Sequence, residues 1–193
     1  MTTIGDPIVV ALRVAELLER IGVRYTIGGS IAASLAGEPR STIDIDVVVA
    51  LTQAHVAPML AAFGADFYLD DAALSRAIDT KGTVNLVEHE SNIKVDLFVA
   101  GGTPLDDQQL TRRQLVEIRP GQSLFVHPAE DILLQKLRWF VKGGETSDRQ
   151  WRDILGIIRT QGERLDRVYL AANAPVLEVS APLDRALQQS RAR

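Results

Sequence analysis

The stretch that decides the fold is "YTIGGSIAASLAGEPRSTIDIDVVVA", residues 25–50. A short β-rich run leads into a Gly-Gly-Ser turn at residues 28–30, then an alanine-rich segment, then an apolar run that contains Asp44 and Asp46. This order predicts a strand, a glycine turn, a short helix and a second strand. Aspartate is unfavourable in strands and costly to bury. The two carboxylates therefore need a physical explanation.

Side chains alternate along a strand, so Asp44 and Asp46 are expected on one face, about 7 Å apart along the strand. Two carboxylates at this spacing repel each other unless a cation or a proton lies between them. Asp96 in "IKVDLFVA", residues 93–100, is a lone aspartate in a second apolar run. If the two strands are neighbours, three carboxylates converge on one sheet edge. Such a set suits Mg²⁺, with Mn²⁺ as the alternative ion, and a two-metal site for phosphoryl or nucleotidyl transfer.

The glycine turn supplies a second feature of a nucleotide site. Gly28 and Gly29 let the backbone come close to a ligand. The N–H groups at the start of the following helix, with the Ser30 hydroxyl, can hold a phosphate. A triphosphate held by metal at one end and by this helix at the other is the arrangement that we expect.

These residues resemble the nucleotidyltransferase superfamily with the DNA-polymerase-β-like fold. That family has Gly-Gly or Gly-Ser, a spacer, Asp-x-Asp or Asp-x-Glu in a strand, and a third carboxylate in a later strand. The spacer of thirteen residues is at the upper end of the family range, and residues 40–42 (Arg-Ser-Thr) are similar to the AbiE-type toxin branch. The matching residues are Gly28, Gly29, Ser30, Asp44, Asp46 and Asp96.

The resemblance implies a role for each position. Asp44 and Asp46 would bind metal, and Asp96 would serve as a further metal ligand or as a general base. Gly28, Gly29 and Ser30 would bind the phosphates of a nucleoside triphosphate. In the AbiE-type branch a lysine and an aspartate from the helical C-terminal part also line the site. Lys136 and Asp153 are the candidates here, with Lys136 placed against the triphosphate.

Each feature also has a structural explanation without a site. The aspartates at 44 and 46 could belong to an exposed edge strand, where charges block pairing. The glycines could form an ordinary turn, and Asp96 could face solvent. Asp153 could pair with a neighbouring arginine of its own helix, and Lys136 could lie on a solvated surface. The two tryptophans, Trp139 and Trp151, are expected in a helix–helix core.

The rest of the pattern predicts an α/β (α+β) fold, with a small mixed sheet flanked by helices and a helical part after it. Residues 1–127 are the expected nucleotidyltransferase core, and residues 128–193 the expected helical C-terminal subdomain, ending in a charged tail. Helices are expected at 7–21, 52–64 and 69–78, and a hairpin over 83–100. Two short strands are expected around Pro120, and three helices follow from residue 128.

Composition limits the class of protein. The chain has 193 residues, of which 46% are hydrophobic and 24% charged, as in globular proteins. No apolar run is long enough to span a membrane, and the N-terminal stretch lacks the basic start of a signal peptide. Cysteine is absent, which excludes disulfides and thiolate metal sites and favours a cytoplasmic location. The net charge of −4 argues against a bulk nucleic-acid coat protein and leaves room for a local basic patch.

Two functional classes remain open. The first is an Mg²⁺-dependent nucleotidyltransferase that moves an NMP from an NTP to an acceptor hydroxyl on RNA, protein or a small molecule, with a toxin–antitoxin role implied by the AbiE-type resemblance. The second is a catalytically inactive nucleotide- or partner-binding module on the same fold. The expected partners are an NTP, an acceptor such as tRNA, and an antitoxin protein. The basic residues of the helical part either meet RNA or are balanced by nearby acids.

Overall fold

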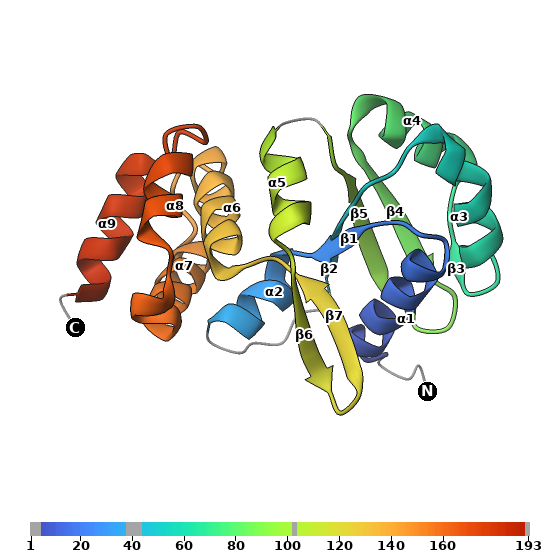
Figure 1. The fold of residues 1–193 in the computed structure, drawn as a ribbon, viewed down its shortest axis with the longest axis horizontal. Coiled ribbons are helices and arrows are strands. Elements are labelled where there is room, and N and C mark those ends of the chain that lie inside the picture. The colour runs from blue at the N-terminus through green and yellow to red at the C-terminus, as the bar shows by residue number, and fades with distance from the viewer. Residues whose placement is uncertain (1–4, 38–43, 102–103, 192–193) are drawn as a thin grey trace. The chain divides into compact units, whose positions relative to one another are not determined.

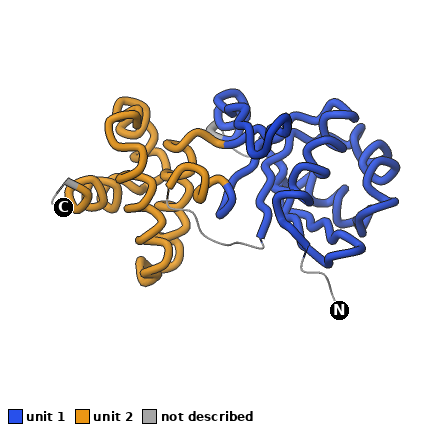
Figure 2. The backbone as a smooth tube through the Cα atoms, turned by 90° about the horizontal axis from the view of Figure 1, so that it is seen from below, with its two compact units in different colours: residues 1–31, 41–126 blue, residues 32–40, 127–193 orange. Residues whose placement is uncertain are grey.

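The computed structural model describes residues 5–37, 44–101 and 104–191. It divides into two compact units (Figure 2). The first comprises residues 1–31 and 41–126, and the second comprises residues 32–40 and 127–193.

The first unit is built on a seven-stranded sheet in the order β3-β4-β5-β2-β1-β7-β6 (Figure 1). β2 pairs in parallel with β5 and antiparallel with β1, so β2 is an interior strand. β4 and β5 form the expected hairpin, and β6 and β7 form the one expected around Pro120. The strands are β1 (Tyr25–Ile27), β2 (Ile45–Val49), β3 (Phe67–Tyr68), β4 (Thr83–Glu88), β5 (Lys94–Val99), β6 (Gln114–Arg119) and β7 (Gln122–Val126).

Helices of the first unit follow from local capping and apolar periodicity. The Asp6 carboxylate accepts a hydrogen bond from the Ile8 N–H at the start of α1, and the Asp70 carboxylate does the same for Ala73 at the start of α4. The buried positions of α1 recur at helical spacing. The helices are α1 (Pro7–Arg20), the 3₁₀ turn η1 (Gln53–His55), α3 (Val56–Phe63), α4 (Asp71–Thr80) and α5 (Pro104–Arg112). Helix α2 (Gly29–Ala36) begins in the first unit, and its residues from 32 onward belong to the second.

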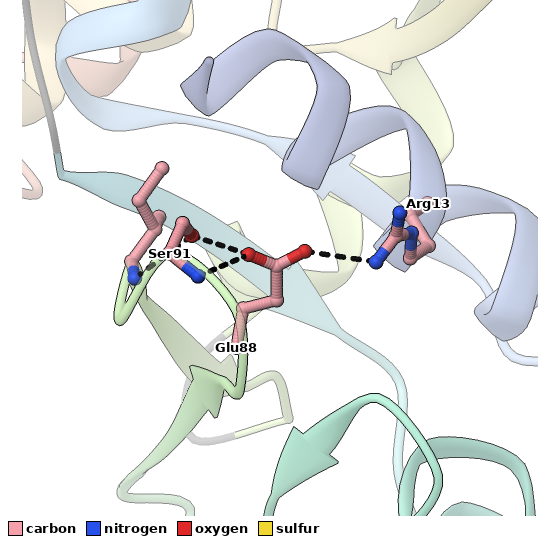
Figure 3. A network of polar contacts seen from close by, with 4 residues as sticks. Arg13, Glu88 and Ser91 are labelled. Carbon is pink, nitrogen blue, oxygen red and sulfur yellow. Dashed lines mark hydrogen bonds and ion pairs between the residues drawn. The ribbon is translucent and has the colours of Figure 1, made fainter. Parts of the chain in front are cut away.

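A buried carboxylate joins α1 to the end of β4 (Figure 3). Glu88 is only 4% exposed, and its carboxylate lies 2.8 Å from the Arg13 guanidinium. The other carboxylate oxygen accepts hydrogen bonds from the Ser91 N–H, at 3.1 Å, and from the Ser91 hydroxyl. Because both oxygens are occupied, Glu88 is buried without an unmet charge, and the helix is tied to the β4–β5 turn.

The second unit is a cluster of helices. α6 packs on α7 and α8, and α7 packs on α9. Ser147 caps α7 by accepting a hydrogen bond from the Gln150 N–H. The elements are α6 (Ala129–Lys142), α7 (Asp148–Gln161), the 3₁₀ turn η2 (Gly162–Arg164), α8 (Arg167–Asn173) and α9 (Ser180–Arg191).

The predicted fold class is confirmed, and several local predictions are wrong. The expected charged tail is helix α9, whose Leu183 and Ala186 are buried. The short strand β3 and helix α5 were not predicted. Trp139, expected in a core, is 54% exposed, whereas Trp151 packs on Phe140 with ring centroids 5.1 Å apart. Of the helices in the described ranges, none combines the length and apolarity that crossing a membrane requires.

Candidate functional site

Two interior strands bring Asp46 and Asp96 together. In the parallel pairing of β2 with β5, Asp46 lies directly opposite Asp96, so both side chains leave the same face of the sheet. Asp44 comes just before β2 and is exposed. The aspartates therefore do not block a sheet edge, and the edge-strand explanation is wrong. The prediction that the three carboxylates converge on one sheet edge is also wrong, because Asp46 and Asp96 lie on strands at the middle of the sheet.

The electrostatics of Asp46 show that this cluster carries excess negative charge. Burial raises the pKa of the Asp46 carboxyl, and the nearby Asp96 and Asp44 carboxylates raise it further. A hydrogen bond from the Ser30 N–H and the charge of Lys94 act in the opposite direction without cancelling the rise. When they are ionised, these carboxylates therefore repel one another in the protein without a ligand. A cation bound next to them would reduce this repulsion.

The Gly-Gly-Ser turn is built around Asp46. The Gly28 N–H donates to the Asp46 carbonyl at 2.9 Å, which continues the β1–β2 ladder by one residue. Gly29 has φ +54°, and a Cβ there would lie 1.7 Å from Oδ2 of Asp46. Ser30, at the start of α2, directs its backbone N–H to the Asp46 carboxylate. The turn therefore does more than change the chain direction, because it places a helix N-terminus against the central carboxylate.

The Asp96 carboxylate has partners that the sequence analysis missed. Asn85 lies opposite Asp96 in the antiparallel β4–β5 pairing, and its side-chain amide donates to Oδ1. Lys94, two residues before Asp96 on the same strand face, places its ammonium 2.8 Å from Oδ2. The sequence could have indicated the contact between Lys94 and Asp96, because these two charged residues alternate in an apolar run. The contact of Asn85 could be predicted only once the hairpin register was known.

The donor set fits a hard divalent cation. Carboxylate oxygens are the ligands that Mg²⁺ prefers, and Asp44 and Asp46 supply them next to the Asp96 carboxylate. Within the described ranges, no three or more Asp, Glu, His or Cys side chains already form a group that could hold a metal ion. The assignment of Asp96 as a third ligand therefore stays a prediction, since its oxygens are engaged by Asn85 and Lys94.

Lys136 and Asp153 pair with each other in the second unit. The Lys136 ammonium lies 2.8 Å from Oδ2 of Asp153, and the two side chains are 13% and 15% exposed. The solvated-surface reading of Lys136 is therefore wrong. Asp153 holds a lysine of the neighbouring helix α6, a partner that the sequence did not predict. The role of this pair at a nucleotide stays a prediction.

Comparison with solved structures places this architecture among known folds. An antigenic nucleotidyltransferase-like protein from Paracoccidioides brasiliensis aligns with a TM-score of 0.61 at 19% identity, over 95% of this chain and 92% of that one. The chain has the nucleotidyltransferase fold. The antibiotic-resistance factor ANT(2'')-Ia aligns with a TM-score of 0.57 at 14% identity, over 96% of this chain and 100% of that one. JHP933 from Helicobacter pylori aligns with a TM-score of 0.51 at 14% identity, over 97% of this chain and 93% of that one.

Sequence comparisons add no closer relative. No protein-family model and no curated protein matches the sequence. At these identities the nucleotidyltransferase fold is a statement about architecture, and the chemistry has to be argued from the residues of the site.

Proposed function

We propose that this protein is an Mg²⁺-dependent nucleotidyltransferase that moves an NMP from an NTP to an acceptor hydroxyl. The observation that carries the proposal is the pairing of Asp46 opposite Asp96 on interior strands, with the turn at Gly29 and Ser30 directed at Asp46. A half-buried carboxylate with a raised pKa, beside two further carboxylates, is unfavourable for stability and is typical of functional sites.

Each residue has a distinct part in the proposed reaction. The acceptor oxygen attacks the α-phosphorus of the NTP, the bond to the β-phosphate oxygen breaks, and pyrophosphate leaves. Asp44 and Asp46 hold Mg²⁺, which when bound withdraws charge from the phosphates. Asp96 accepts the acceptor's hydroxyl proton, with Asn85 orienting its carboxylate. The α2 N-terminus at Ser30 favours negative charge next to Asp46.

The remaining contacts that we propose with the nucleotide are those that the sequence predicted. Gly28 and Gly29 allow close approach of the phosphates, and Lys136 neutralises charge on the triphosphate. Asp153 positions Lys136, since a carboxylate 2.8 Å away fixes an otherwise flexible ammonium. Mn²⁺ is the alternative ion for the same oxygen ligands.

We further propose RNA as the acceptor. The sequence alone left open whether the basic residues of the second unit meet RNA or are balanced by nearby acids. In the structure Glu130 and Asp131 are buried, Asp153 pairs with Lys136, and Glu145 pairs with Arg185. The exposed arginines of α7 recur at helical spacing, as Arg149, Arg152 and Arg159. On the exposed side of α7 the remaining acid of this set, Asp148, lies beside Arg149 and Arg152, so these positions keep an excess of positive charge that suits a phosphate backbone.

An exposed aromatic ring adds to the RNA proposal. Trp139 on α6 is 54% exposed, and the Lys142 ammonium lies 5.1 Å from its ring centroid. Exposed tryptophan beside a cation is a combination that stacks unpaired bases of single-stranded nucleic acid. A tRNA acceptor end is an RNA of this kind.

Labelled NTPs test the proposal directly. Each of the four, with Mg²⁺ or Mn²⁺, would be incubated with the protein and total tRNA, and the label followed in RNA and in protein. We expect label in RNA with wild-type protein and none with Asp46→Asn. Label confined to the protein would replace RNA by a protein acceptor. Nucleotide binding without any transfer, to RNA, protein or small molecule, would support the inactive binding module.

The resemblance to AbiE-type toxins extends the proposal to a toxin restrained by an antitoxin protein. The expected result is growth arrest on expression of the wild-type chain and normal growth with Asp46→Asn. Equal growth with both chains would remove the toxin role and leave the transferase proposal in place.

A further inference from the structure

A lysine is built into the carboxylate cluster. Lys94 and Asp96 are two residues apart on β5, so both side chains leave the face that also carries Asp46. The Lys94 ammonium lies 2.8 Å from Oδ2 of Asp96. The hydrogen bond to Asp96 raises the pKa of the Lys94 ammonium, and the negative charges of Asp96, Asp44 and Asp46 raise it further.

The contacts of Asp96 show what this lysine does. Oδ1 accepts the Asn85 amide and Oδ2 accepts the Lys94 ammonium, so both oxygens already have a donor. The Asp96 side chain is 17% exposed, whereas that of Lys94 is 51% exposed. The carboxylate is thus held by the sheet, and the cation comes from a side chain that reaches it from solvent.

We infer that Lys94 is a built-in counter-ion that occupies, at Asp96, the position of a second divalent cation, so that the resting site takes a single metal ion at Asp44 and Asp46. This inference rests on the proposed function for the metal at Asp44 and Asp46. It accounts for two findings together. The Asp96 and Asp44 carboxylates both act electrostatically on Asp46, yet no ready group of three metal-ligating side chains exists in the described residues.

Titration with Mn²⁺ in the absence of nucleotide tests the inference. Free and bound Mn²⁺ would be counted by electron paramagnetic resonance for wild type, Lys94→Met and Lys94→Arg. We expect Lys94→Met to gain a second bound ion, with a total affinity at least about fivefold higher, because one positive charge within ~4 Å is removed. Lys94→Arg keeps the charge and should match wild type. Lys81→Met removes an exposed lysine of the same unit and controls for net charge.

A second measurement keeps this inference separate from the proposed function. In metal-free buffer, Lys94→Met should melt at a lower temperature than wild type, because the carboxylates lose their resident cation, and Mn²⁺ should reverse the loss. Lys94→Met with wild-type Mn²⁺ stoichiometry and affinity would overturn the inference. If wild type binds no Mn²⁺, the metal site of the proposed function is refuted. The counter-ion role of Lys94 is then tested only by the melting temperature in metal-free buffer. No decrease in that temperature would then refute the counter-ion role.

Discussion

Gly29 and Asp46 are packed so closely that a Cβ on residue 29 would lie 1.7 Å from Oδ2 of Asp46. The same glycine has φ +54°, a conformation that side chains disfavour. The absence of a side chain at position 29 and the position of the central carboxylate therefore depend on each other. Any side chain at residue 29 would therefore have to displace the Asp46 carboxylate.

Gly29→Ala should accordingly damage the site as well as the turn. We expect a loss of stability of about 2–4 kcal/mol, from strain at positive φ and from the clash, and loss of nucleotide transfer. Denaturant unfolding and a transfer assay measure the two effects. Gly121→Ala is the matched control, because Gly121 also has positive φ and nothing lies within 4 Å of its Cβ position. Equal stability losses in the two variants would mean that the contact with Asp46 is unimportant.

Asp46→Asn should stabilise the metal-free protein at neutral pH. The folded-state pKa of Asp46 is raised above the ordinary 3.8, so the native state binds this proton more tightly than the unfolded chain does. Its favourable contribution is complete below pH 3.8 and is lost as pH rises through the raised folded-state pKa. The variant removes the penalty and also this part of the pH dependence. Thermal melts in EDTA from pH 4 to pH 8 would show it, and a wild-type pH profile in Asp46→Asn would argue against a repelling cluster.

Lys136→Met should lower both stability and transfer. The expected stability cost is about 1–3 kcal/mol, because a mostly buried carboxylate loses its charged partner, and the expected loss of rate is roughly 10–100-fold. A double-mutant cycle with Asp153→Asn measures the contribution of the ion pair separately from the other effects of each substitution. Arg138→Met, about 200° further round α6, is the control. Equal and small effects on transfer from Lys136→Met and Arg138→Met would remove Lys136 from the nucleotide site.

Glu88→Gln should destabilise the first unit without a direct effect on the chemistry. The buried Glu88 carboxylate bridges Arg13 to Ser91, and an amide cannot accept from both (Figure 3). We expect a loss of about 1–3 kcal/mol in urea unfolding. Glu145→Gln is the comparison, because its pair with Arg185 is exposed on both sides and should contribute less than about 1 kcal/mol. The same loss in both variants would mean that burial of Glu88 is irrelevant.

The sequence predicted the parts of the site that depend on local pattern. The order strand, glycine turn, helix and aspartate strand followed from residues 25–50, and the alternation rule placed Asp46 on one face. What it could not supply was long-range register. The parallel pairing of β2 with β5 puts Asp96 opposite Asp46, and the hairpin register puts Asn85 opposite Asp96. The first pairing joins strands that are far apart in the chain, and the second depends on the exact register of the hairpin, which the local pattern left open.

The errors in the fold have the same origin. β3 is two residues long, too short for a periodic signal, and α5 has a strongly polar sequence with a weak apolar stripe. α9 was mistaken for a tail because most of its residues are polar or charged and only a few, Leu183 and Ala186 among them, are buried. Trp139 was assigned to a core on residue type alone, and only the packing of α6 shows that its ring is exposed.

The measurement that tests the central claim most directly is pyrophosphate release from each NTP with Mg²⁺ and tRNA, compared between wild type and Asp46→Asn. Asp46→Asn is the sharpest variant, since it keeps the shape of the side chain that Gly29 and Ser30 surround, while it removes the negative charge and replaces one acceptor oxygen by an NH₂ donor. The account predicts Mg²⁺-dependent release by wild type, abolished by EDTA, and a rate reduced at least about 100-fold in the variant, which remains folded. Release at the wild-type rate by a folded Asp46→Asn protein would contradict the account.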